Sequence, residues 1–337
     1  MVDKYRGCLY GAAFGDCLGG PVEFVRTVWE IRQRVDDDGP RLPVHGRVTD
    51  DTQMMLYVGE ALVQAGPPYT PERLEAPLVN AFVRWLNDPD NTRAPGRTCI
   101  SACMALSRGF PWRESTIRGS KGCGANMRVQ PVGLLKADDE TIGGVAQFQA
   151  ALTHGHSTGL AAAELTAIAI ARLIEGMDPL KLPAYLREYA ESQRHIYREK
   201  WLGDLWDRAG FPYKRAFAER GWEECLAVLA RLDNALQEPE HRRDLGVDPC
   251  EATGDGWIAE EAFATGLLCF LLYPNEPLKA LHRATLTSGD TDSIACLTGA
   301  FAGASCGAGA FPQEWFERIE YAGRLEGVIG ALTPSGA

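Results

Sequence analysis

Glycine recurs at every fourth position near the start of the chain. Gly7, Gly11, Gly15 and Gly19 all lie within residues 4–19, whose apolar residues have roughly helical spacing. Each glycine inside a helix costs about 1 kcal/mol relative to alanine, so four of them at this spacing need a reason. A second helix that approaches this one very closely supplies the reason. The stretch therefore predicts a helix over 4–19, closely packed against another helix.

The rest of the chain also has a helical pattern, because runs of alternating β-branched residues are hardly present. We expect an all-α bundle in one domain over 1–337, since no long linker or repeat of fixed period interrupts it. The most polar section, 187–257, is a possible helical surface insertion within that domain. Further helices are expected over 51–65, 72–87, 97–107, 125–136, 140–152, 159–175, 179–209, 222–235, 259–272, 276–285, 292–306 and 313–325.

Composition narrows the function classes. The 337 residues are 45% hydrophobic and 23% charged, which is typical of a globular protein with a substantial core. The formal charge of -11 makes nucleic acid unlikely as the main partner, because phosphate binding needs a basic face. Ten cysteines are scattered without a C-x-x-C pair or a zinc set, so we expect them to be small buried residues in a reducing cytosol. We expect no signal peptide, no membrane span and a cytoplasmic protein.

Two acidic clusters each precede an apolar or small-residue run. The first is Thr49-Asp50-Asp51-Thr52, and the second, 240 residues later, is Thr287-Ser288-Gly289-Asp290-Thr291-Asp292-Ser293. Each alone is explained as a capped helix start facing the positive end of the helix dipole. If the two starts converge, however, four carboxylates and several hydroxyls would offer hard oxygen ligands for one or two divalent cations such as Mg²⁺ or Mn²⁺. Without a cation these acids would repel one another strongly.

Other stretches are less specific. Closely spaced glycines over 119–128 could expose backbone N–H groups to a phosphate, but neither a P-loop nor a Rossmann turn is present. His154 and His156 lack a third ligand for zinc, so a polar cap or a substrate contact is the better interpretation. Residues 25–47, with the acidic run at 36–38, suggest a mobile surface loop or lid.

Five motifs follow one another along the chain in a fixed order. They are Gly11-Ala12-Ala13-Phe14-Gly15-Asp16-Cys17-Leu18-Gly19-Gly20-Pro21-Val22-Glu23-Phe24, Thr49-Asp50-Asp51-Thr52, Gly122-Cys123-Gly124-Ala125-Asn126-Met127-Arg128, Thr153-His154 and Ser288-Gly289-Asp290-Thr291-Asp292-Ser293. In this order the motifs resemble the ADP-ribosylglycohydrolases, a family that includes the dinitrogenase reductase-activating glycohydrolases and the ADP-ribosyl-acceptor hydrolases. The resemblance spans residues 5–307, and the ordered combination is far more specific than any one motif.

The resemblance implies a compact orthogonal multi-helix bundle with a cleft that holds two Mg²⁺ ions, or Mn²⁺. It implies catalytic roles for Glu23, Asp50 and Asp292. The implied metal ligands are Thr49, Asp50, Asp51, Asp290, Asp292 and Ser293. The implied substrate-binding residues are Gly122, Cys123, Gly124, Asn126, Met127, Arg128 and His154.

The chain departs from the family pattern at a few positions. Ser293 stands where many members have threonine and Ser288 replaces a frequent glycine, while Cys123 and Asn126 differ from the residues common in the glycine stretch. The first change retains a hydroxyl ligand. The last two affect the expected details of substrate contact.

The implied reaction is hydrolysis of the bond between the anomeric carbon of ADP-ribose and an acceptor atom on a modified protein or other target. The metals would orient the ribose and a water, and Glu23 or a ligand aspartate would relay the proton. Two alternatives remain: a non-catalytic member that binds ADP-ribose or a partner, and an unrelated two-metal hydrolase such as a phosphatase. The acceptor linkage stays open.

Overall fold

A computed structural model describes residues 1–35 and 39–333, with the side chains of 242 and 243 left aside, so the acidic run at 36–38 lies outside the described residues. Within that part the secondary structure is helical, and the only β contacts are three isolated bridges, which confirms the all-α prediction. The α-helices are α1 Val2–Gly19, α2 Val28–Arg32, α3 Asp50–Ala65, α4 Pro71–Leu86, α5 Arg97–Ser107, α6 Trp112–Ser115, α7 Asp139–Ala151, α8 Ser157–Ile174, α9 Leu182–Gln193, α10 Glu199–Leu202, α11 Leu205–Arg208, α12 Lys214–Gln237, α13 Glu240–Arg243, α14 Pro249–Thr253, α15 Ala259–Leu272, α16 Pro277–Thr285, α17 Thr291–Cys306, α18 Gln313–Arg318 and α19 Ala322–Leu332. The short 3₁₀ helices are η1 Gly20–Val22, η2 Cys123–Ala125, η3 Gln130–Leu134, η4 Pro179–Lys181 and η5 Ala308–Ala310.

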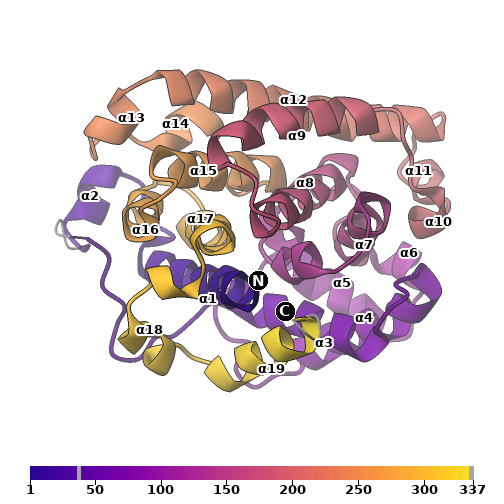
Figure 1. Ribbon diagram of the computed structural model, residues 1–337. Coiled ribbons are helices and arrows are strands. Elements are labelled where there is room, and N and C mark those ends of the chain that lie inside the picture. Colours follow the sequence, from indigo (N-terminus) through magenta and orange to yellow (C-terminus); the bar gives the residue numbers. More distant parts are fainter. Residues whose placement is uncertain (36–38, 334–337) are drawn as a thin grey trace.

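Helices α1 and α17 form the central pair of the bundle (Figure 1). A Cβ atom on Gly11 would lie 2.2 Å from the carbonyl oxygen of Gly299, and one on Gly15 would lie 1.9 Å from that of Ala295. Gly7 faces Gly303 in the same way, so the two helices run antiparallel with their backbones in contact. The close approach predicted from the glycine spacing is confirmed, and its partner is the helix that follows the second acidic cluster.

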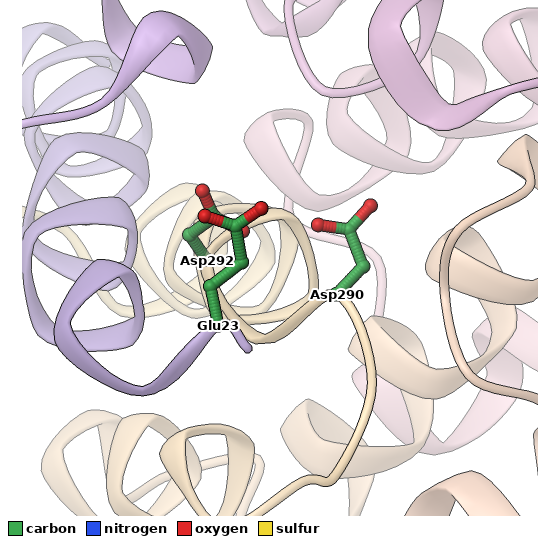
Figure 2. A group of neighbouring side chains, drawn as sticks. All are labelled: Glu23, Asp290 and Asp292. Carbon is green, nitrogen blue, oxygen red and sulfur yellow. The ribbon is translucent and has the colours of Figure 1, made fainter. Parts of the chain in front are cut away.

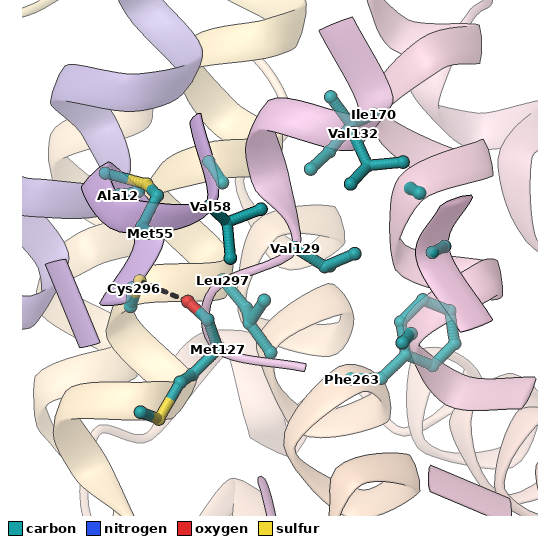
Figure 3. Close-up of a cluster of buried hydrophobic side chains, with 14 of the residues drawn as sticks. Ala12, Met55, Val58, Met127, Val129, Val132, Ile170, Phe263, Cys296 and Leu297 are labelled. Atoms are coloured by element: carbon teal, nitrogen blue, oxygen red, sulfur yellow. Dashed lines mark hydrogen bonds between the residues drawn. The ribbon is translucent and has the colours of Figure 1, made fainter. Parts of the chain in front are cut away.

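The other helices cover this pair in layers. On one side α8 and α15 pack beside α17, and α12 with α9 covers them as the outermost layer (Figure 1). On the other side α3 packs on α4 and α19. Beneath the acidic clusters, one hydrophobic core joins α1, α3, α17 and the segment after the glycine stretch, as Figure 3 shows for Ala12, Met55, Met127 and Leu297. In that core the Cys296 thiol donates a hydrogen bond to the Met127 carbonyl.

Three predicted helices are interrupted. The prediction of one helix over 125–136 is wrong, because Pro131 follows a glycine-rich turn and only the 3₁₀ helices η2 and η3 form. The helix expected over 179–209 is divided into η4, α9, α10 and α11, with Gly203 in a positive-φ conformation at the end of α10. The helix expected over 313–325 is broken by Tyr321, whose φ of 59° cannot continue a right-handed helix.

The polar section 187–257 is largely helical and contributes to the main core. Helix α12 packs against α8 and α15, and its Trp222, Leu229 and Leu232 are buried there. The loop predicted over 25–47 contains the short helix α2, and Val25, Val28 and Ile31 form a small cluster with Leu286. This part of 25–47 is therefore packed onto the body of the protein.

The cysteines and the apolar helix α8 are the subject of two expectations from the sequence. All ten cysteines are free thiols, and nine of them are buried. Helix α8 is long and apolar enough to cross a membrane by length and composition, but 89% of that segment is buried inside the bundle. A core helix of a globular protein passes the same test, and the packing of α8 explains its composition.

Candidate active site

Three helix ends meet at one place, and two of them do so because α1 and α17 are antiparallel. The last turn of α1, which carries Asp16, lies beside the first turn of α17, which carries Asp292. A Cβ atom on Gly19 would lie 2.6 Å from the Cα atom of Asp292, so no side chain separates the two ends. The first turn of α3, with Asp50 and Asp51, joins them from the other side.

Asp16 fixes the start of α3 and is the main site residue to which the sequence assigned no role. Its fully buried carboxylate accepts hydrogen bonds from the backbone N–H groups of Thr49 and Thr52 at 3.0 and 3.1 Å. The Thr52 hydroxyl donates a third bond to Asp16 at 2.5 Å. Thr52 therefore positions the helix start, and the detectable signal was that Asp16 is the one charged residue in the part of α1 that follows Arg6.

The acidic side chains of the two clusters converge with Glu23. Potential ligand oxygens of Glu23, Asp290 and Asp292 all lie within 4.8 Å of one another. Figure 2 shows the carboxylates of Glu23 and Asp292 beside each other at the start of α17, with that of Asp290 close by. Asp50 and Asp51 line the same cleft and are buried, so the predicted convergence of the two helix starts is what the structure has.

Burial and mutual repulsion both disfavour the charged forms of these acids. Burial, followed by the charge of Asp292, raises the pKa of Asp16 to about 7, that of Asp50 to about 8 and that of Glu23 to about 9. The same two causes raise the pKa of Asp51 and Asp290 well above the usual range. A bound cation is the ordinary way to keep such a cluster ionised at neutral pH.

The donor set fits a divalent cation. Oδ2 of Asp51 is buried without a hydrogen-bond partner in the described part of the chain, although such an atom normally has one. The surrounding donors are carboxylates with the Ser293 and Thr49 hydroxyls, which are the hard oxygen ligands that Mg²⁺ and Mn²⁺ take. Thr49 is also the N-cap of α3, since its hydroxyl accepts a bond from the Asp51 N–H at 3.3 Å. The capped helix start and the candidate metal site are thus compatible.

The acids lie in a cleft of about 440 Å³. Eleven of the residues predicted for the site line it, namely Glu23, Asp50, Asp51, Gly122, Cys123, Gly124, Met127, His154, Asp290, Asp292 and Ser293. Thr49 lines an adjoining hollow of about 350 Å³, and Glu23 lines both. The glycine stretch and the two acidic clusters are therefore parts of one site.

Comparison with known proteins agrees with this geometry. A family model described as ADP-ribosylglycohydrolase matches residues 1–336. The chain belongs to the ADP-ribosylglycohydrolase family. Among its relatives is ADP-ribosylhydrolase ARH3 of Homo sapiens, 28% identical over 95% of this chain and 90% of the relative. ADP-ribosylarginine hydrolase Tri1 of Pseudomonas putida is 23% identical over 96% of this chain and 76% of the relative.

A solved structure titled ADP-ribosylglycohydrolase-related protein complex has the same fold. It superposes with a TM-score of 0.64 and 21% sequence identity, covering 98% of this chain and 97% of that one. The helical bundle of this family is therefore established for the chain.

Two predicted substrate contacts do not lie in the cleft of this ADP-ribosylglycohydrolase. The Arg128 guanidinium is fully buried, donates to Gln149 and Thr153 at 2.8 Å and lies over the Phe82 ring. The Asn126 amide donates to the Ala259 carbonyl at 3.0 Å. Both side chains use their donors in hydrogen bonds to neighbouring protein groups, and these bonds hold the glycine stretch on the side away from the cleft. Neither residue is among those that line the cleft.

The two histidines have different roles. His154 lines the cleft, and its Nδ1 is 2.8 Å from the Thr153 hydroxyl. Burial, with the nearby Arg128 charge, lowers the pKa of His154 to about 3, so its ring is neutral. His156 caps α8 by accepting a hydrogen bond from the Thr158 N–H at 3.2 Å. The polar cap offered by the sequence is found at His156, and a substrate contact stays a prediction for His154, which lines the cleft.

The sequence also missed part of the cleft wall. Phe24, Arg97, Thr98 and Trp257 line the cleft, although no motif drew attention to three of them and Phe24 entered only beside Glu23. The rings of Phe24 and Trp257 stack with centroids 6.2 Å apart and planes 18° apart. Phe24 and Trp257 are exposed for large aromatic residues, which the sequence could not show, and their pairing could be found only from the fold.

Proposed function

We propose that this ADP-ribosylglycohydrolase is a metal-dependent enzyme that cleaves the glycosidic bond between ADP-ribose and a modified acceptor. The observation that carries the proposal is the buried carboxylate cluster with its unpartnered Asp51 oxygen, set in a cleft walled by the glycine stretch. The human relative is an ADP-ribosylhydrolase and the Pseudomonas putida relative is an ADP-ribosylarginine hydrolase, which supports the same chemistry. Its partners would be an ADP-ribosylated protein or other target and free ADP-ribose.

The residues that would hold two Mg²⁺ ions, or Mn²⁺, are Thr49, Asp50, Asp51, Asp290, Asp292 and Ser293. A divalent cation bound there would supply Lewis-acid chemistry, polarising a water and the sugar hydroxyls. Glu23 comes from the loop after η1, and a ligand oxygen of its carboxyl lies within 4.8 Å of those of Asp290 and Asp292. The family resemblance gives Glu23 a catalytic role and not a ligand role, so we assign proton transfer to its carboxyl. Burial, followed by the charge of Asp292, raises the pKa of Glu23 in the metal-free site, which favours the protonated form, and Glu23 lines both the cleft and the adjoining hollow.

In the proposed reaction Glu23 gives its proton to the acceptor atom as the glycosidic bond breaks, and then takes one from the attacking water. The carboxylates of Asp50 and Asp292 stabilise positive charge that develops at the anomeric carbon. The glycine stretch 122–124, which has no bulky side chains apart from Cys123, lets the substrate approach the backbone closely.

The test is ADP-ribose release from arginine-, serine- and nucleic-acid-linked substrates, with and without Mg²⁺. We expect release from one of these classes with Mg²⁺ and its loss with a chelator. Asp50→Asn, Asp292→Asn and Glu23→Gln should each lose at least about a hundredfold in kcat, as is typical when a proton-transfer or charge-stabilising group is removed. The exposed Glu317→Gln on α18 is the matched control, and its rate should equal that of the wild type.

Other outcomes identify the alternatives. Calorimetric binding of ADP-ribose without turnover of any substrate would indicate a non-catalytic member. Release of inorganic phosphate from simple phosphoesters, without ADP-ribose release, would indicate a two-metal phosphatase. Full activity in all three site variants would show that the assigned site is wrong.

A further inference from the structure

Part of the cleft wall is built from two short segments. The Cys123 N–H donates to the Trp257 carbonyl at 3.1 Å, and the Ala259 N–H donates to the Lys121 carbonyl at 2.9 Å, which forms an antiparallel bridge between Gly122 and Ile258. A single bridge of this kind is only marginally stable in water. The segment 119–124 also contains three glycines, so its backbone has much conformational freedom to lose. Hydrogen bonds to other parts of the chain also hold this wall, among them one from the Asp290 N–H to the Asp255 carbonyl at 2.7 Å, and a charged tether would add to them.

Lys121 supplies a tether on the side away from the cleft. Its ammonium donates to Glu224 of α12 at 2.7 Å and to Glu260 in the first turn of α15. The Glu260 side chain is only 4% exposed, and its Oε2 atom has no hydrogen-bond partner in the described part of the chain. Glu260 therefore depends on Lys121, because a buried carboxylate without a paired cation is costly.

Glu224 is itself held from two other directions. It accepts a hydrogen bond from the Thr158 hydroxyl of α8 at 2.8 Å and forms an ion pair with Arg220 at 2.6 Å. Lys121 thus connects the wall to α8, α12 and α15 at once. Charge-assisted bonds of this kind are stronger and more directional than neutral ones.

The wall also supports the residue beside Glu23. Trp257 stacks on Phe24, and Phe24 is the chain neighbour of Glu23. The contacts therefore run from Lys121 through the bridge to Trp257, and from there to the lip of the cleft.

We propose that Lys121 is a positioning residue, which holds the glycine wall and Trp257 in the arrangement that binds ADP-ribose. The inference rests on the proposed function for its choice of ligand. It also assigns a role to α12, in the polar section 187–257, because that helix supplies Glu224. Lys121 is not among the cleft-lining residues and does not act on the substrate directly.

The test compares the full-length chain with Lys121→Met. Hydrogen exchange followed by mass spectrometry should be about tenfold faster over 119–128 and 254–262, the size expected when a charge-assisted bond is lost, and unchanged over α19. By calorimetry ADP-ribose should bind about tenfold more weakly, and in turnover KM should rise by the same factor with kcat little changed. Lys121→Arg should restore both.

Lys214→Met is the matched control, since Lys214 makes an exposed ion pair with Glu199, and it should leave exchange and binding unchanged. If Lys121→Met does not fold, Glu224→Gln tests the same tether from its more exposed side and should speed exchange in the same two segments. Unchanged exchange over both segments would overturn the proposal, as would an equal effect of Lys214→Met. The exchange measurement needs no ligand, so a chain that fails to bind or release ADP-ribose would refute the proposed function and leave the test of Lys121 intact.

Discussion

Replacing Gly15 by alanine would insert a methyl group into the contact between α1 and α17. The new carbon would lie 1.9 Å from the carbonyl oxygen of Ala295 and 2.3 Å from its carbonyl carbon. Real Cβ atoms essentially never come within 3.0 Å of such neighbours, so the helices would have to separate by about 1 Å. Both obstructing atoms belong to the backbone, and no rotamer change removes the clash.

The magnitude follows from two opposing effects. Alanine gains about 1 kcal/mol of helix propensity over glycine. Overpacking of a rigid contact costs about 1–3 kcal/mol and occasionally more, and here the whole helix pair must move. Because both obstructing atoms are backbone, we take a cost at or just above the upper end of that range, about 3–4 kcal/mol; less the propensity gain of about 1 kcal/mol, Gly15→Ala should lower the free energy of unfolding by about 2–3 kcal/mol.

Gly327→Ala on α19 is the matched control. Gly327 lies on the exposed face of its helix, and a Cβ atom there would have no heavy atom within 4 Å. This variant should be as stable as the wild type or gain up to about 1 kcal/mol. Urea denaturation followed by circular dichroism measures the stability of both variants, and their midpoints are compared where the slope of unfolding free energy against urea concentration is equal. If the two substitutions shift the midpoint equally, the close backbone contact inferred here does not exist in solution.

Three further predictions concern the acids. First, the pKa values of Asp16, Asp50 and Glu23 are raised to about 7, 8 and 9. The contribution of these groups to the stability of the metal-free protein should therefore be greatest below about pH 4 and should be lost as pH rises through these values. Denaturant midpoints measured from pH 5 to 9, in chelator and in Mg²⁺, should show this loss only in chelator. Second, Asp51→Asn should raise the melting temperature in chelator, because it removes one of the mutually repelling acids. The same variant should be stabilised less by Mg²⁺ than the wild type. A lower melting temperature of the variant in chelator would contradict the inferred repulsion among the acids. Third, Thr52→Val removes the hydroxyl that donates to Asp16 and should cost about 1.5–3 kcal/mol of unfolding free energy. Thr166→Val, at a buried hydroxyl that has no partner among the described residues, should cost nothing. Equal losses in urea denaturation would refute the role of Thr52.

The glycine spacing was sufficient to predict a close helix contact, but it left the partner open. The partner has its own small residues at the same interval, Ala295, Gly299 and Gly303, which face the first set. A pattern of this kind shows which face of a helix is lined by small residues. It cannot show which other helix packs against that face, because that depends on the path of the chain between the two helices.

The convergence of the acidic clusters could be predicted for a similar reason, since mutual repulsion makes two such clusters improbable without a shared ligand. Asp16 was harder to assign, because a lone aspartate in a helix gives no periodic signal and its three donors come from α3. Arg128 and Asn126 were assigned to the substrate because they belong to the glycine motif. Their side chains turn into the protein, and sequence spacing in an irregular segment does not determine side-chain direction.

The electrostatic and packing features of the site depend on each other. The ion pairs recorded for residues 1–35 and 39–333 do not include any of the six acids Asp16, Glu23, Asp50, Asp51, Asp290 and Asp292. Partial charges at the starts of α3 and α17 offset only part of their repulsion. In a loosely packed bundle, the helix ends would move apart to relieve the rest. The backbone contact between α1 and α17 opposes that movement, because the four glycines of α1 leave no side chains that could repack. The metal-free fold therefore retains the cost of burying these acids together, either as repulsion or as the proton uptake that their raised pKa values describe, and a bound divalent cation would remove that cost.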